Sequence, residues 1–384
     1  MPSVTARYAR FCSPENSYGN VAEVEFVLSP DTRPPNGLSA TASDLINLHT
    51  VVAWRMSDAG GLISSVLVYR AISPFGPYTV MTPDGLPPSQ TAWTDTGIVP
   101  GVCYYYKVAS LLNTASGPIE TPSDYVAYVP LMHVERDGND LSQLRPGMTV
   151  ISTHGAFSPS LTVSNIFDGD LTNYADINDR NPAIGVNLAK PYEIHFMRFA
   201  ARSNQLGRIN GAELRGSNDP DYTNDSTRLA VFAGAKVEAF VTLPTETHEA
   251  FQYIFVQRPD DGEFYGNLSE LELYGIDPDV ANSLPQAPVI SHSFRPNGKV
   301  DLTWTAEGTQ DFFRVERSAD NGASWTTLGT TAGITFTDAA PLRDQLALYR
   351  VTAVLTGPPE ETAYSDTYPL YTYGARDGTV LMVK

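Results

Sequence analysis

Cysteines, long apolar runs and basic clusters are all scarce in this chain of 384 residues. Its two cysteines, Cys12 and Cys103, fall in different predicted modules; one bridge could join them, but we expect two unpaired thiols rather than a disulfide-stapled scaffold. No apolar run approaches the roughly 20 residues of a spanning helix, so we expect no membrane insertion. The formal charge of −18 excludes a nucleic-acid partner, because phosphate recognition requires clustered Lys and Arg.

Signatures of catalysis and secretion are also missing. The six histidines are scattered, at positions 49, 133, 154, 195, 248 and 292, without a zinc-binding spacing. There is no Gly-x-Ser-x-Gly elbow, phosphate-binding loop or dinucleotide fingerprint. The N-terminal Met-Pro-Ser-Val-Thr-Ala-Arg lacks the apolar core of a signal peptide. We therefore predict that the chain is not an enzyme.

Signals for β-structure, in contrast, fill the sequence. Alternating runs rich in β-branched and aromatic residues, such as 300–304, recur about every 8–12 residues with Gly, Pro, Asn and Asp between them. Helical periodicity is nearly absent. The predicted fold class is all-β, arranged as tandem β-sandwiches.

Two segments, 31–130 and 286–372, share an ordered set of four strand motifs. Each has an inner-strand Trp, an apolar strand ending in Arg, an aromatic-Thr-Asp strand and a Tyr-basic-Val strand. The motifs are Trp54, Val68-Tyr69-Arg70, Trp93-Thr94-Asp95 and Tyr106-Lys107-Val108, then Trp304, Val315-Glu316-Arg317, Phe336-Thr337-Asp338 and Tyr349-Arg350-Val351. Both segments resemble fibronectin type III domains, and the resemblance implies that they are spacers.

The segment 131–285 between them carries three motifs in a fixed order. An acidic turn at 165–174 precedes a Gly-Ser-Asn-Asp turn at 216–219 and a closing Glu-x-Glu-x-Tyr-Gly strand at 268–275. This order resembles a discoidin-like domain (coagulation factor 5/8 type C), a family that includes many galactose-type carbohydrate-binding modules. The resemblance implies an eight-stranded jelly-roll sandwich. Tyr174 departs from the pattern, because the family usually has Trp there.

Members of that family often hold a structural calcium ion near the acidic turn, and the resemblance implies one here. Calcium prefers about six to eight hard oxygen ligands, mixing carboxylates with carbonyls. The expected ligands are Asn165, Asp168, Asp170, Thr172 and Glu270, the last brought to the same corner by the closing strand. The alternative is an Asp-Gly-Asp turn held only by Asx hydrogen bonds, without an ion.

The resemblance further implies a sugar site in the loops at one end of the sandwich. Guanidinium and amide donors match vicinal hydroxyls, and a flat aromatic ring takes the apolar face of a pyranose. The candidate residues are Tyr174, Arg202, Asn204, Arg208, Phe264 and Tyr265. In the alternative, the arginines pair with nearby carboxylates and Tyr265 packs in the core.

One pattern occurs twice: residues 18–26 read Tyr-Gly-Asn-Val-Ala-Glu-Val-Glu-Phe, and residues 265–273 read Tyr-Gly-Asn-Leu-Ser-Glu-Leu-Glu-Leu. Residues 1–30 therefore resemble the closing strands of an incomplete discoidin-like module. An isolated strand pair is only marginally stable and leaves open edges. We expect residues 5–28 to pack on the first fibronectin-like module or to pair with another chain in self-assembly. Residues 373–384 are assigned as a C-terminal tail.

The leading hypothesis is a non-catalytic extracellular, cell-surface or virion-surface protein. Its discoidin-like module would bind a glycan or another surface ligand, for example in adhesion, while the flanking modules set its reach. The first alternative is a structural subunit of a filament, phage tail or surface layer. The second alternative is an accessory region of a secreted glycoside hydrolase.

Overall fold

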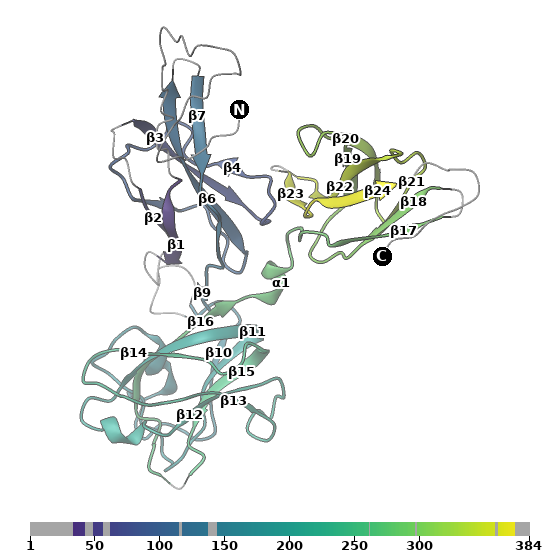
Figure 1. The fold of residues 1–384 in the computed structure, drawn as a ribbon. Coiled ribbons are helices and arrows are strands. Elements are labelled where there is room, and N and C mark those ends of the chain that lie inside the picture. The colour runs from purple at the N-terminus through teal and green to yellow at the C-terminus, as the bar shows by residue number, and fades with distance from the viewer. Residues whose placement is uncertain are drawn as a thin grey trace, which may run out of the picture.

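The computed structural model describes residues 34–42, 49–56, 62–114, 117–136, 144–260, 262–295, 298–357 and 360–372. Strands dominate these ranges, with one short α-helix, α1 (Pro278–Ala281), and two 3-10 segments. Figure 1 shows three lobes of strands with α1 between them. The predicted fold class, all-β in tandem sandwiches, is confirmed.

The first lobe packs a three-stranded sheet against a five-stranded sheet. The smaller sheet has the order β1–β2–β5, and the larger has β4–β3–β6–β7 with β8 also pairing with β6. The strands are β1 (Asn36–Ala42), β2 (Thr50–Arg55), β3 (Ile63–Ala71), β4 (Thr79–Val80), β5 (Ala92–Asp95), β6 (Tyr104–Thr114), β7 (Gly117–Pro122) and β8 (Val126–Tyr128). Inward side chains from both sheets, among them Trp54, Val68 and Tyr106, form its core.

The third lobe repeats this topology strand for strand. Its smaller sheet is β17–β18–β21, and its larger sheet is β20–β19–β22–β23 with β24 also on β22. The strands are β17 (Ile290–Phe294), β18 (Val300–Trp304), β19 (Phe312–Ser318), β20 (Thr326–Thr331), β21 (Thr335–Asp338), β22 (Gln345–Leu355), β23 (Glu361–Tyr364) and β24 (Tyr368–Thr372). Trp304 and Tyr349 occupy the core here, as Trp54 and Tyr106 do in the first lobe.

A buried aspartate holds the two sheets of each outer lobe together. In the third lobe, Asp338 Oδ2 accepts hydrogen bonds from Arg317 Nη1 at 2.7 Å and from the Tyr349 hydroxyl at 2.7 Å. In the first lobe, Asp95 Oδ2 accepts the matching bonds from Arg70 and Tyr106, at 2.8 and 2.9 Å. The aligned sequence motifs therefore occupy equivalent positions in two equivalent sandwiches.

The middle lobe contains eight strands in one folded sheet, β13–β12–β15–β11–β16–β9 with β10 and β14 also on β11. They are β9 (Met132–His133), β10 (Thr149–Ser152), β11 (Ile184–Ala201), β12 (Glu213–Ser217), β13 (Thr227–Val231), β14 (Val241–Pro244), β15 (Ala250–Gln257) and β16 (Leu268–Ile276). The 3-10 segments η1 (Val163–Phe167) and η2 (Leu206–Arg208) lie in its loops. Eight strands agree with the jelly-roll expectation.

The long strand β11 belongs to both layers of this lobe. Its first half, around Ile184, pairs with β10 and β15, whereas its second half, around Phe199, pairs with β14 and β16. Between the halves Ala189 adopts a φ of 64°, and Pro191 follows shortly after, so the strand bends there. Bending one strand across both layers encloses a single core that includes Phe167, Phe199 and Leu271.

The segment around α1 contacts all three lobes. Lys190 of the middle lobe binds Asp277 at 2.6 Å and Asp279 at 2.9 Å. Val280 and Leu284 pack against the core of the first lobe. On the other side, Thr309 Oγ1 of the third lobe donates to Asn282 O at 2.9 Å. The linker is therefore a packed junction.

The first and third lobes also touch directly, although the middle lobe separates them in sequence. Tyr364, on the edge strand β23, donates its backbone N–H to Gly76 O at 3.0 Å. Ser73 Oγ in turn donates to Tyr364 O at 3.0 Å. In Figure 1 the loop after β3 accordingly approaches β23. The outer lobes thus form a joined frame and not two independent spacers.

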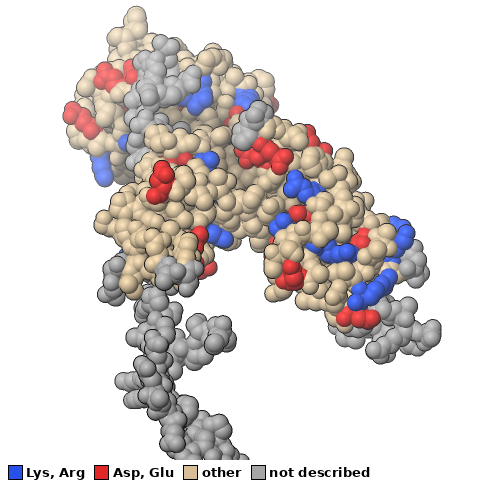
Figure 2. Space-filling view, turned by 90° about the horizontal axis from the view of Figure 1, so that it is seen from above, with Lys and Arg blue, Asp and Glu red and all other residues tan. Residues whose placement is uncertain are grey.

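Several expectations concern residues outside the described ranges. These are the incomplete module at 1–30 with the self-assembly segment 5–28, the tail at 373–384, and Cys12, the candidate partner of the half-buried Cys103. No helix in the described ranges combines the length and apolar character needed to cross a bilayer. Figure 2 shows acidic and basic side chains interspersed on one face of the molecule, without a basic stripe.

The shared aspartate gives a stability prediction. Replacing Asp338 by Ala leaves the Arg317 guanidinium and the Tyr349 hydroxyl without their common acceptor, which should cost about 3 kcal/mol of the free energy of unfolding of the third lobe. Urea denaturation followed by tryptophan fluorescence measures it. The matched control is Asp301→Ala, whose partly exposed bonds with Arg295 and Thr337 should contribute far less. If the two variants lost equal amounts of the free energy of unfolding, the role of Asp338 as the bond between the two sheets would be contradicted.

Candidate functional site

The predicted ligand residues gather where β16 begins. Ala201, the last residue of β11, pairs with Leu268, the first residue of β16. The turn after β11 and the turn before β16 therefore lie side by side. The other end of β16, Ile276, leads into α1, about 26 Å along the strand. The candidate site thus faces away from the junction of the lobes.

Two arginines at this end stack on tyrosine rings. The Arg202 guanidinium carbon lies 4.0 Å from the centroid of Tyr174, and that of Arg208 lies 4.7 Å from the centroid of Tyr265. Both distances fit cation–π contacts, which hold each guanidinium plane in place. The structure therefore brings together four of the predicted residues, and Asn204 joins them by accepting a bond from Arg202 Nε at 2.9 Å.

A buried amide that the sequence reasoning missed connects the two arginines. Asn267 Oδ1 accepts from Arg208 Nη1 at 2.7 Å and from Arg202 Nη1 at 3.4 Å, while its Nδ2 donates to Ala175 O. The signal was present in the repeated Tyr-Gly-Asn pattern. Arg202 also pairs with Asp176 at 2.8 Å, so the alternative of carboxylate pairing is partly realised.

The turn before β16 separates the two predicted aromatic ligands. Tyr265 has a φ of 53° and Gly266 a φ of 69°, so the chain reverses sharply at these residues. This reversal leaves Tyr265 half-buried against Arg208 but points Phe264 into the core, where it is fully buried. The prediction that Phe264 contacts a ligand is therefore wrong.

An exposed aromatic ring lies on the neighbouring loop instead. Phe157 is 71% exposed, and its backbone N–H donates to Asp176 O at 2.7 Å. His154 on the same loop faces Asp179 at 3.6 Å. The sequence reasoning missed Phe157 because it stands before the acidic turn, outside the motifs that were compared.

Both arginines retain unused donors. The Nη2 group of Arg202 makes no hydrogen bond within the described part of the chain, and that of Arg208 reaches only Glu263, at 3.9 Å. Positioned guanidinium groups with free N–H groups, and an exposed ring on the adjoining loop, suit a ligand that has hydroxyls on its edges and an apolar face.

The acidic turn shows the hydrogen bonds of the ion-free alternative. Asp168 Oδ1 accepts the N–H of Asp170 at 2.9 Å, and Asp170 Oδ1 accepts that of Thr172 at 2.8 Å. The bonds from Thr172 lower the pKa of Asp170. Asn165 uses its amide nitrogen to bind Ser160 O and Tyr174 O.

Beneath this turn lies a buried charged cluster centred on Arg136. Its guanidinium, fully buried, contacts Glu270 Oε1 and lies 3.9 Å from both Glu135 and Glu272. Glu270 Oε2 accepts the N–H of Gly169 at 2.8 Å, which ties the cluster to the acidic turn. Glu272 also pairs with Arg198 at 2.9 Å, so two guanidinium groups face the three carboxyl groups.

Two observations fit a cation at this corner. Asn173 Oδ1 is buried and accepts no hydrogen bond, although the Asn173 amide nitrogen donates to Asp168 at 2.8 Å. Glu270 Oε2 reaches the same turn through the N–H of Gly169, which brings a second carboxyl group to this corner beside Asp168. No three Asp, Glu, His or Cys side chains in the described ranges form a group that could hold a metal, so amide and backbone oxygens would have to complete the set.

Comparison by sequence finds no matching protein family and no matching curated protein. Among solved structures, carbohydrate-binding module CBM62 from Clostridium thermocellum Xyl5A is similar at 25% identity, covering 33% of this chain and 93% of that one, with a TM-score of 0.31. A fucolectin from striped bass (Morone saxatilis) serum has 18% identity over 60% and 78%, with a TM-score of 0.34.

A family 32 module from Clostridium perfringens NanJ, solved in complex with galactose, has 18% identity over 33% of this chain and 93% of that one, with a TM-score of 0.27. At TM-scores this low, the likenesses carry no argument. The functional case therefore depends on the side chains of the middle lobe.

The buried cluster predicts how stability changes with pH. Burial raises the pKa of Glu135 to about 8 and that of Glu270 to about 9, while Arg136 acts in the opposite direction. Burial lowers the pKa of His133 to about 3, while its ordinary value is 6.5, so that group is almost wholly neutral in both states above about pH 7.5. From about pH 7.5 to 9 the folded chain holds protons that the unfolded chain has released, so the free energy of unfolding should fall as pH rises.

Calorimetric melting of the full chain across this window checks the sign. Glu135→Gln should flatten the fall, because one of the two titrating groups is gone, whereas Glu263→Gln at an exposed position should not. A melting transition of the middle lobe that rises with pH would contradict the account.

Proposed function

We propose that the middle lobe is a non-catalytic module that binds a saccharide at the loop end where β16 begins. One observation carries the proposal: the loop that carries the strongly exposed ring of Phe157 is hydrogen-bonded to Asp176, and Asp176 in turn pairs with Arg202, one of two arginines stacked on tyrosines. An aromatic face for the apolar side of a sugar and fixed donors for its hydroxyls are the two elements that such recognition needs.

The roles of the residues follow from their contacts. Arg202 and Arg208 would donate to hydroxyls through their free N–H groups, while Asn267 and Asp176 position them. Phe157 would stack on the ring of the sugar. Tyr174 and Tyr265 support the guanidinium planes and do not themselves face the ligand.

The frame of the outer lobes supports presentation of this site on a surface. The ligand end of β16 lies opposite the junction, so the bound glycan would meet no part of the frame near α1. A single open site of this kind gives low affinity, and several copies on an extracellular or virion surface would bind by avidity. A structural subunit and an accessory region of a glycoside hydrolase remain the alternatives.

We also propose that calcium occupies the corner beneath the acidic turn. The unpartnered Asn173 Oδ1 supports this; Asp168 would supply one charged oxygen, and Glu270 would supply a second by giving up its proton when the ion binds. The ion would fix the turn that precedes Tyr174 and Asp176, and so stabilise the loop end.

A glycan array probed with the full chain tests saccharide binding. Phe157→Ala and Arg202→Gln should each reduce binding about tenfold or more, because one removes the stacking face and the other a charged donor. Phe294→Ala is the matched control, since that ring is 52% exposed on the third lobe and should leave binding unchanged. An array that stays blank with and without calcium would refute the proposal.

Thermal melting with calcium and with a chelator tests the ion. Calcium at 100 times its dissociation constant should stabilise the middle lobe by about 2.7 kcal/mol. Asn173→Ala should abolish the difference between the two conditions, whereas Asp225→Asn, at an exposed acidic position, should preserve it. Identical melting curves for the native chain in calcium and in chelator would exclude a structural ion.

A further inference from the structure

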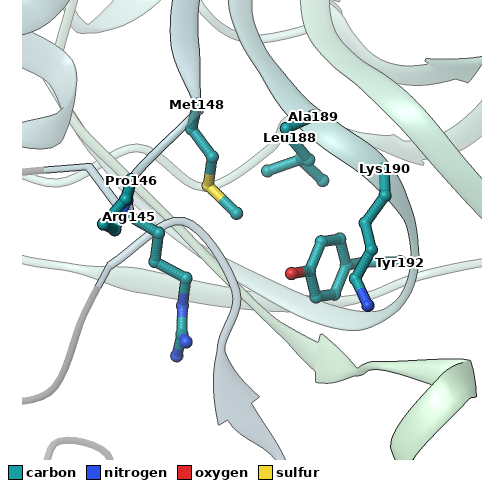
Figure 3. Close-up of a pocket in the computed structure, with 7 residues that line it drawn as sticks. All are labelled: Arg145, Pro146, Met148, Leu188, Ala189, Lys190 and Tyr192. Carbon is teal, nitrogen blue, oxygen red and sulfur yellow. The ribbon is translucent and has the colours of Figure 1, made fainter.

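A second hollow lies at the opposite end of the middle lobe, near α1. It encloses about 370 Å³, within the range of small-molecule sites. Figure 3 shows the seven residues that line it. They are Arg145, Pro146, Met148, Leu188, Ala189, Lys190 and Tyr192. The loop before β10 and the bend of β11 supply them.

The floor of this hollow is apolar and well packed. Leu188 is 1% exposed and Tyr192 is 7% exposed, and both belong to the core of the lobe. Met148 packs against the same core from the other side. Because the floor is part of the core, the hollow keeps its shape without a ligand.

One polar group in the floor lacks a partner. Tyr192 is 7% exposed as a residue, and its hydroxyl makes no hydrogen bond with a described residue, while the buried Nε of the neighbouring Arg145 also lacks a described partner. In Figure 3 the phenol oxygen points into the space between Met148 and Arg145. Because the hydroxyl faces the open hollow, an acceptor bound there would be within its reach.

Cationic groups stand on two sides of that oxygen. Arg145 uses Nη2 to bind His133 O at 3.1 Å, but its Nη1 binds no described residue, and no carboxylate of the described ranges forms an ion pair with it. Lys190 lies 5.5 Å from the Tyr192 ring centroid, held by Asp277 and Asp279. The unpaired charge of the hollow is therefore that of Arg145.

We propose that this hollow binds a small organic carboxylate. The carboxylate would accept from Arg145 Nη1 and the Tyr192 hydroxyl, and its flat or apolar body would lie over Met148 and Leu188. A guanidinium and a phenol suit a carboxylate because both donate in fixed directions. An acidic sugar ring and an aromatic acid share this chemistry.

The site is separate from the proposed saccharide site. Glu193, next to Tyr192, pairs with Ile276 at the junction end of β16, whereas the loop end lies at Leu268. Because Lys190 of the hollow also binds Asp277 and Asp279 beside α1, a ligand here would lie at the junction of the three lobes. The inference therefore does not depend on the proposed function.

Titration of the isotope-labelled full chain at pH 7, followed by backbone amide shifts, tests the inference. The probes are glucuronate and benzoate, and the neutral partners are glucose and benzamide. We expect saturable shifts at Ala189 and Tyr192 with one or both carboxylates and none with the neutral partners. The carboxylate that binds more tightly identifies the body as a sugar ring or an aromatic ring.

Variants give an independent readout. Arg145→Gln should weaken carboxylate binding about tenfold or more, and Tyr192→Phe about fivefold. Lys236→Gln removes an exposed positive charge from the same lobe and should change nothing. The inference is overturned if the amides of Ala189 and Tyr192 stay unshifted at saturating carboxylate, or if neutral partners bind equally well.

Discussion

The buried guanidinium of Arg136 is the constraint on which the middle lobe depends. It follows β9, where the chain leaves the first lobe, and contacts Glu270 on the closing strand β16. Glu270 also accepts the N–H of Gly169, so one carboxyl group joins the segment after β9, the closing strand β16 and the acidic turn. A buried charge is tolerated only when it is paired in this way, and removal of one partner is costly. The contacts of Glu270 with Arg136 and Gly169 therefore hold the acidic turn at the loop end of the lobe.

Strand β16 separates two surfaces with different chemistry. At Leu268 the loops carry two stacked arginines and the exposed ring of Phe157, whereas at Ile276 the chain enters the junction of the three lobes. Lys190, Val280 and Thr309 tie that junction to all three lobes. A site that faces outward from a packed frame is held in a fixed direction, and the binding loops do not have to contribute to the packing.

Pattern and order in the sequence were sufficient for the strands, the twofold occurrence of the outer sandwich and most of the loop cluster. The Trp, Arg, Asp and Tyr motifs predicted positions that the structure occupies with the same Asp–Arg–Tyr bonds. Side-chain direction could not be predicted at Phe264, because it depends on the φ of 53° at Tyr265. Phe157 and Asn267 were missed for a similar reason: their roles arise from contacts between loops far apart in sequence. The contact between the outer lobes through Tyr364 could likewise not be predicted, because no local sequence pattern indicates it.

The central claim is that the loop end of the middle lobe binds a saccharide. Crystals of the full chain soaked with the best-binding glycan test it most directly. The account predicts a sugar ring stacked on Phe157, with hydroxyls within hydrogen-bond distance of Arg202 or Arg208. Density for the glycan elsewhere on the molecule, with these side chains untouched, would contradict the account.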